Sequence, residues 1–204
     1  MLGPLRSVTV GPGLLFAGYG LGLSLLRRGR YLECRSLLDE MLPMARRIGG
    51  TMFLCTIPVL EAELEDVLGN HATARRAATE AVASALDGSA VADWFLPLIT
   101  AARLGSIEGF ETLLAAARKH ATYPALSAAL AETEAVLSGG RAEFGLAAEL
   151  YAELELPYQE MRCRLEAKDA NAAKALINRF GLENSPVGSR AAGARVGRRH
   201  SGKV

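Results

Sequence analysis

The chain has 204 residues, of which 50% are hydrophobic and 22% are charged, and its formal net charge at pH 7 is +1. This composition supplies enough apolar sequence for a sizeable core and excludes a chain that is disordered throughout. The charge is uneven, because residues 184–204 carry five basic residues and no acidic one. The sequence therefore predicts a mildly acidic folded domain over residues 1–183 and a basic, disordered tail over residues 184–204.

The first apolar segment, residues 8–26, contains no charged residue and is almost as long as a membrane span. Pro12 and five glycines interrupt it, and it has no signal-peptide cleavage pattern. Two interpretations of this segment are a membrane span and the first helix of a repeat. The glycines favour the repeat helix, so we expect that this protein does not interact with a membrane. Because an end helix normally has a polar outer face, we expect this segment to contact an upstream domain or, in a homo-oligomer, a second copy.

Turns separate helix-forming apolar segments at a nearly regular interval along the chain. The residues that we take as equivalent in these turns are Gly29, Gly69, Gly105, Gly139 and Lys168. Their spacings of 40, 36, 34 and 29 residues lie around the roughly 34 residues of a tetratricopeptide unit. The period predicts a repeat protein in which each unit is a pair of antiparallel helices.

The first unit matches the tetratricopeptide pattern in residue type. Leu21-Gly22 on the first helix is followed by Tyr31 after the turn and by Cys34 and Leu38 on the second helix. A small residue lets a neighbouring helix approach, and a larger apolar residue fills the groove beside it. Gly22 is therefore predicted to be a packing position and not a helix breaker.

The apolar periodicity predicts ten helices and no strand. Their ranges are 12–28, 31–48, 51–68, 71–86, 90–104, 107–120, 123–138, 141–154, 157–167 and 170–181. The predicted fold class is all-α, an α-α superhelix in the form of a tetratricopeptide-like solenoid of about five antiparallel helix pairs. Such a stack has a concave groove, where we expect a protein partner or a small inducer to bind.

The most specific pattern lies between Phe144 and Gly181. An apolar helix leads into the turn Leu154-Glu155-Leu156-Pro157-Tyr158, an arginine-containing helix follows, and a last helix ends at Phe180-Gly181. This pattern resembles the last helical pairs of large bacterial LuxR/MalT-type transcriptional regulators. The resemblance is close over residues 144–181 and loose from about residue 14 onward.

In those regulators the helical array lies between an N-terminal NTPase and a C-terminal helix-turn-helix module. The resemblance therefore implies a sensor or protein-interaction scaffold in transcription regulation. No Walker motif precedes the array and only 23 residues follow Gly181, so the ATP-binding and DNA-reading residues of the family have no counterparts in this sequence. We expect an array without those modules, either a stand-alone protein or a fragment of a larger regulator.

Two places in the predicted helices are candidate partner contacts. Glu61 and Glu65 lie one turn apart on one face of the helix predicted over residues 51–68. We expect this face to be solvated, with contact to a basic partner as the alternative. Trp94, the only tryptophan, is interpreted as a core residue, and as a partner anchor if it is exposed in the groove.

Arg198 and Arg199 are the candidate contacts of the basic tail. Clustered arginines attract phosphates independently of nucleotide sequence, so an alternative function is that of an accessory protein that contacts nucleic acid. The Gly, Ser and Ala content favours a solubilising tail instead, and we expect no direct binding of nucleic acid. Residues 197–203 also fit Gly-x-x-x-x-Gly-Lys, but no Ser or Thr follows the lysine, so they predict no nucleotide site.

The sequence contains no constellation typical of an enzyme. Its three histidines stand apart from any nucleophile or metal-ligand pattern, so we predict no catalytic residue, no metal and no cofactor. Cys34, Cys55 and Cys163 are widely spaced and lie in apolar helical segments. They are predicted to be small core residues of a protein in the reducing cytoplasm.

Overall fold

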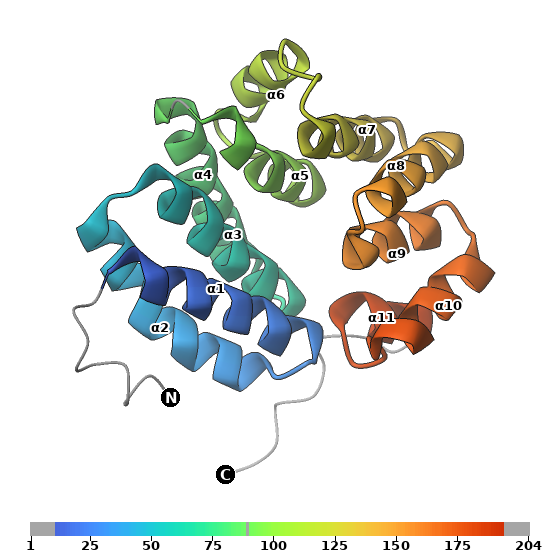
Figure 1. Ribbon diagram of the computed structural model, residues 1–204, viewed down its shortest axis with the longest axis horizontal. Helices are drawn as coiled ribbons and strands as arrows, with labels where there is room; N and C mark the ends of the chain where they lie inside the picture. Colours follow the sequence, from blue (N-terminus) through green and yellow to red (C-terminus); the bar gives the residue numbers. More distant parts are fainter. Residues whose placement is uncertain (1–10, 89, 194–204) are drawn as a thin grey trace.

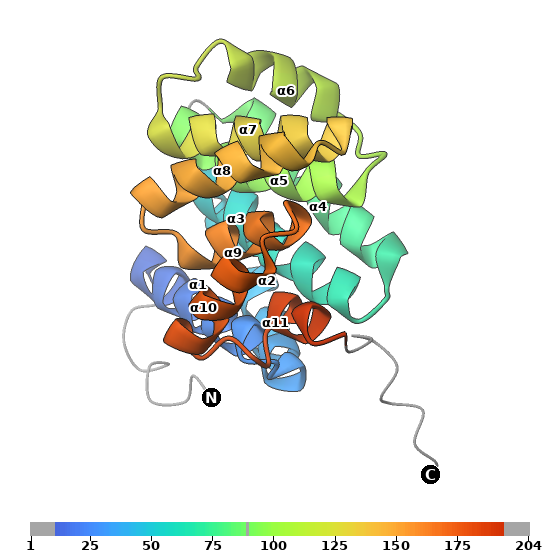
Figure 2. The same cartoon turned by 90° about the vertical axis from the view of Figure 1, so that its right-hand side faces the viewer.

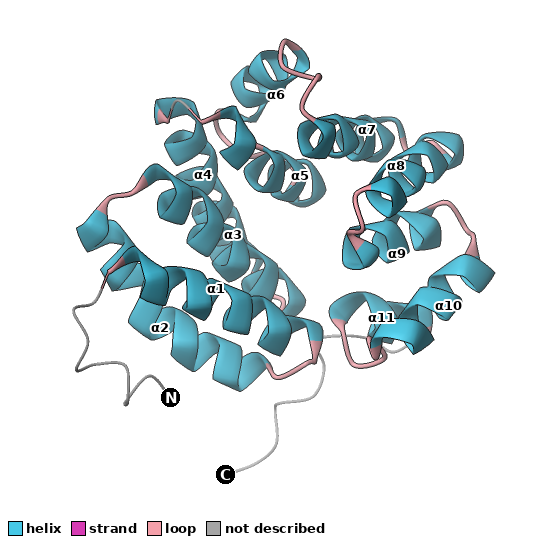
Figure 3. Ribbon diagram, viewed as in Figure 1, coloured by secondary structure: helices cyan, strands magenta, loops and turns pink. Residues whose placement is uncertain are grey.

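The computed structural model describes residues 11–88 and 90–193. These residues form eleven α-helices, a short 3-10 helix and no strand (Figure 3). In chain order the elements are α1 (Pro12–Arg27), α2 (Tyr31–Ile48), α3 (Thr51–Val67), α4 (His71–Asp87), η2 (Val91–Asp93), α5 (Phe95–Leu104), α6 (Phe110–Arg118), α7 (Pro124–Ser138), α8 (Arg141–Glu153), α9 (Pro157–Glu166), α10 (Ala170–Phe180) and α11 (Pro186–Ala191). The predicted all-α fold class is confirmed.

All ten predicted helices are present, and two regions differ from the expectation. The helix predicted over residues 90–104 is divided into η2 and the shorter α5, whose first turn contains Pro97. The second difference is α11, which lies inside the segment that we assigned to a disordered tail. Its start has an ordinary helix signal, since the Ser185 hydroxyl accepts a hydrogen bond from the Gly188 amide at 2.9 Å and Pro186 occupies the first helical position.

The turn residues that we took as equivalent share one backbone conformation. All five have positive φ: Gly29 at 71°, Gly69 at 82°, Gly105 at 64°, Gly139 at 69° and Lys168 at 67°. Lys168 therefore occupies the left-handed conformation that glycine adopts without strain, at a cost of about 1–2 kcal/mol for a residue with a Cβ. Its turn closes in the usual way, because the Asp169 amide donates to the Arg164 carbonyl at 2.9 Å.

The helices pack as antiparallel neighbours that together curve into one superhelical turn (Figure 1). Within the curve α1 contacts α3, α3 contacts α5 and α5 contacts α7, which makes these helices a continuous inner layer. The views of Figures 1 and 2 both place α10 and α11 beside α1 and α2, so the last helices return to the first. The array is thus an α-solenoid that nearly closes on itself.

Small residues allow the close approach of neighbouring helices. Gly22 of α1 is buried, and a Cβ at this position would collide with Leu60 of α3. The Gly22 carbonyl also accepts a hydrogen bond from the thiol of Cys34 on α2, at 3.5 Å from the sulfur. The prediction that Gly22 is a packing position is therefore confirmed.

Among the described residues, no helix is long and apolar enough to cross a membrane. Helix α1, which holds most of the apolar N-terminal segment, packs against α2 and α3 instead. Its outer surface leaves Phe16 and Leu21 exposed. The expectation that this surface contacts a second copy or another domain stays a prediction.

Candidate functional site

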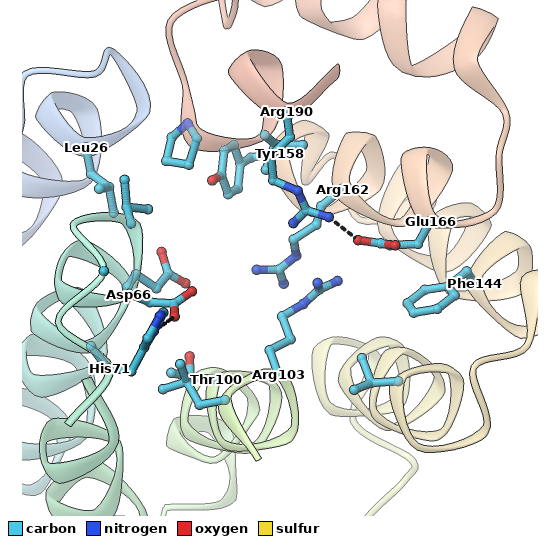
Figure 4. Close-up of a pocket in the computed structure, with 18 of the residues that line it drawn as sticks. Leu26, Asp66, His71, Thr100, Arg103, Phe144, Tyr158, Arg162, Glu166 and Arg190 are labelled. Atoms are coloured by element: carbon cyan, nitrogen blue, oxygen red, sulfur yellow. Dashed lines mark hydrogen bonds and ion pairs between the residues drawn. The ribbon is translucent and has the colours of Figure 1, made fainter. Parts of the chain in front are cut away.

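The concave side of the helical array holds a half-open cavity of about 1050 Å³. Helices α3, α5, α9 and α11 supply most of its wall, and α1, α4, α7, α8 and three turn residues supply the rest. Charged side chains from several of these helices are directed into it (Figure 4). Small-molecule sites reach about this volume, and the position of the cavity agrees with the groove expected for a solenoid.

A buried cluster of charges forms one part of the wall. Glu132 of α7 is fully buried, and its Oε1 accepts a hydrogen bond from Arg103 Nε of α5 at 2.6 Å. Arg162 Nη2 of α9 lies 2.8 Å from Glu132 Oε1, and the Tyr151 hydroxyl of α8 donates to Glu132 Oε2 at 2.7 Å. Side chains from four helices thus meet at a single carboxylate.

All three charged members of this cluster are ionised at neutral pH. Burial by itself would raise the pKa of Glu132, but the guanidinium groups of Arg162 and Arg103 and the hydrogen bond from Tyr151 outweigh it and lower that pKa below its usual value. Burial works against the charge of Arg162, yet the carboxylate of Glu132 raises its pKa above the usual value. Arginine remains protonated in proteins, so the cluster contains two cations and one anion.

Other charged side chains line the cavity around this cluster. Arg190 of α11 donates to Glu166 of α9 at 2.6 Å, and Glu63 and Asp66 belong to α3. Asp66 Oδ1 lies 3.0 Å from Nδ1 of His71. Figure 4 shows the arginine side chains on one side of the cavity and Asp66 with His71 on the opposite wall. The cavity therefore has a basic side and an acidic side.

The expectation of a solvated face at Glu61 and Glu65 is wrong, since only 6% and 2% of their surfaces are exposed. Glu65 pairs with Arg35 of α2 and accepts a hydrogen bond from Asn70 at 2.7 Å. Glu61 accepts one from Arg76 of α4 at 3.1 Å. Helix α3 has a neighbour on each side, so a face that looks polar in the sequence lies between helices. Neither carboxylate lines the cavity.

Trp94 also lies away from the cavity. It packs against the largest core cluster, and its ring meets that of His120 edge to face with centroids 5.6 Å apart. This position agrees with the core interpretation. Arg198 and Arg199 fall outside the described residues, so the nucleic-acid alternative stays a prediction. A truncation that tests the tail without removing α11 ends after Gly193.

The residues of the buried charge cluster were not among the sequence-based candidates. Glu132 did carry a signal, because it lies three and four residues from Ala135, Ala129 and Ala128 on the apolar face of α7. A charged residue on such a face needs a partner. Its partners Arg103 and Arg162 are 29 and 30 residues away in the sequence, and no local pattern connects them to it.

Fold and cavity together define the class of this protein: it is an all-α helical array whose helix pairs curl around a central, charge-lined cavity. Comparisons with protein-family models, with curated proteins and with solved structures find no match to the chain. The resemblance to LuxR/MalT-type regulators therefore stays a prediction.

Proposed function

We propose that this protein is a ligand-binding scaffold that holds a small molecule or a short peptide in its central cavity. The observation that carries the proposal is the convergence of charged side chains from α3, α5, α9 and α11 on one cavity of about 1050 Å³. Charged groups are placed in such a site at a desolvation cost, and their concentration there favours recognition over simple packing. A solenoid that curves this far surrounds its ligand, which suits a sensor.

The resemblance over residues 144–181 supports a more specific role in transcription regulation. This segment corresponds to α8, α9 and α10, and it supplies Tyr158, Arg162 and Glu166 to the cavity wall. In this proposal the array is related to the sensor region of a LuxR/MalT-type regulator, and occupation of the cavity is the event that it reports to a partner protein. The genomic neighbourhood tests this relation: an NTPase and a helix-turn-helix encoded on either side favour it, and unrelated neighbours argue for a separate adaptor.

A pair of substitutions on α7 tests whether the cavity is the binding site. Val136 lines the cavity, whereas the side chain of its neighbour Leu137 is exposed on the surface. Val136→Trp fills part of the cavity, and Leu137→Trp adds the same ring outside it. A library of small metabolites and short peptides is screened by thermal shift against wild type and both variants.

We expect ligands that stabilise the wild type and Leu137→Trp to lose at least about tenfold in affinity for Val136→Trp, which corresponds to about 1.4 kcal/mol. Ligands that bind both variants equally well would show that the site lies elsewhere. Circular dichroism of each variant verifies that the helices remain folded.

A further inference from the structure

The buried charge cluster has more positive charge and more hydrogen-bond donors than its own carboxylate can balance. Two guanidinium groups share Glu132, which also accepts from Tyr151. Two guanidinium groups carry many more N–H donors than a single carboxylate can accept. Arg162 Nε is buried and has no hydrogen-bond partner among the described residues. The surplus of one positive charge is expensive in a buried place unless an anion compensates it.

The cluster is open on the side that faces the cavity. Arg103 and Arg162 line the cavity, whereas the Glu132 that they share does not. Their side chains are 19% and 11% exposed, so they are held in place by surrounding protein and still reach the cavity. Preorganised guanidinium forks match the geometry of a carboxylate or a phosphate group.

The opposite wall limits how much negative charge a ligand can carry. Glu63 and Asp66 line the cavity from α3. Glu63 has no ion pair within 4.0 Å among the described residues, although it contributes to the raised pKa of Arg162 and so lies within electrostatic range of it. A second negative charge on the ligand would be repelled by these carboxylates, whereas a neutral or cationic group at the same place would not be.

We propose that the central cavity binds a small ligand with a single anionic group, a carboxylate or a phosphate, which Arg103 and Arg162 hold. This inference rests on the proposed function, because it names the chemistry of the ligand in the same cavity. It also disfavours nucleic acid as the occupant, since a polyanion would be repelled by the α3 wall.

The test follows the arginine Nε–H signals of 15N-labelled protein by NMR during titration with inorganic phosphate or acetate at constant ionic strength. We expect saturable shifts of the Arg103 and Arg162 signals and none at Arg118, an exposed arginine paired with Glu134 outside the cavity. The anion that binds with the higher affinity indicates whether the anionic group of the natural ligand is a phosphate or a carboxylate. Shifts that never saturate, or that are equal at Arg118, overturn the proposal.

A variant that leaves the buried charge cluster intact provides a second test of anion binding. Glu63→Gln removes a negative charge from the facing wall and is expected to tighten anion binding roughly two- to five-fold. Glu149→Gln is the matched control, because Glu149 is exposed on α8 and does not line the cavity. Equal affinities for the two variants contradict the proposal. If the arginine signals do not respond but Val136→Trp still blocks a ligand from the screen, the anion inference fails and the cavity remains the binding site.

Discussion

Glu132 is a carboxylate with no exposed surface, in a helix whose neighbouring positions are mostly alanine and leucine. An isolated charge in such a place is strongly unfavourable, and it persists here because two guanidinium groups and a tyrosine hydroxyl replace the lost water. The same contacts join α5, α7, α8 and α9 at one point. Glu132 therefore fixes the arginines that form the basic side of the cavity.

Glu132→Gln is expected to lower the free energy of unfolding by about 3–5 kcal/mol, because it leaves two buried cations without their counter-charge. The matched control is Glu134→Gln on the same helix. Glu134 is half exposed and pairs with Arg118 at the surface, so its substitution should change stability by less than about 1 kcal/mol. Urea denaturation measures both, and similar losses in the two variants would contradict a special role for Glu132.

The lowered pKa of Glu132 also predicts how stability depends on pH. A carboxyl whose pKa is lower in the folded state stabilises the protein above its unfolded pKa of about 4.3 and loses this contribution as pH falls through the folded value. The difference in stability between wild type and Glu132→Gln should therefore be largest near pH 7 and shrink below about pH 4. A difference that stays constant down to pH 3 would argue against an ionised Glu132.

The three cysteines are free and fully buried, which confirms their prediction as core residues. Burial raises the pKa of Cys34 to about 11 and those of Cys55 and Cys163 to about 12. Because the thiolate is the reactive form, we expect no reaction with Ellman's reagent in the native protein at pH 8. All three should react after unfolding in guanidinium chloride, and fast labelling of the native protein would contradict the burial.

At the scale of the element, α1 shows that a glycine-rich helix can be built for packing. Its glycines divide into two kinds, because Gly18 and Gly22 face α2 and α3, whereas Gly13 and Gly20 have nothing within 4 Å of an added Cβ. Gly18 and Gly22 are needed because neighbouring side chains leave no room for a Cβ. Gly13 and Gly20 lower the helix propensity of α1 and do not allow any closer packing.

Gly20→Ala and Gly22→Ala test this division within one helix. Gly20→Ala should stabilise the protein by about 0.5–1 kcal/mol, because alanine is the better helix former and its methyl group meets nothing. Gly22→Ala should destabilise it by about 1 kcal/mol or more, since the new methyl group collides with the fully buried Leu60. Denaturation midpoints that shift in the same direction for both variants would contradict the division.

At the scale of the whole molecule, contacts between the first and last helices close the curve of the array. The guanidinium carbon of Arg27 on α1 lies 4.6 Å from the ring centroid of Tyr158 on α9. A Cβ on Gly29 would lie 2.6 Å from the carbonyl oxygen of Asn184. An open pocket of about 280 Å³ lies beside these contacts, between α1 and the end of α10.

Gly29→Ala should open the junction between the first and last helices, and Gly49→Ala is its control. Both glycines have φ of 71°, so both substitutions carry the same backbone strain, but an added Cβ at position 49 has nothing within 4 Å. Hydrogen exchange of amides in residues 182–190 should accelerate in Gly29→Ala and stay near the wild-type rate in Gly49→Ala. Equal exchange in the two variants would show that the junction does not depend on this contact.

Local sequence features were enough to predict the helices from α1 to α10 and their antiparallel pairing. Helix periodicity, the turn residues and the small residue at position 22 are local features, and each depends on backbone geometry within a few residues. For this reason even Lys168, the turn residue without a glycine, could be placed correctly. Helix α11 was not predicted, although Ser185 and Pro186 form a local helix-start signal. The basic composition of residues 184–204 outweighed that signal and led to the prediction of a disordered tail.

Which polar residues are buried, and where the cavity lies, depends on how distant helices pack against one another. Glu61 and Glu65 look like a solvated face until α2 and α4 are placed on either side of them, and Glu132 acquires its partners only when α5 and α9 meet α7. Burial and charge pairing depend on how far the superhelix curves. That curvature is the sum of small rotations between successive helix pairs, and no single segment of the sequence encodes it.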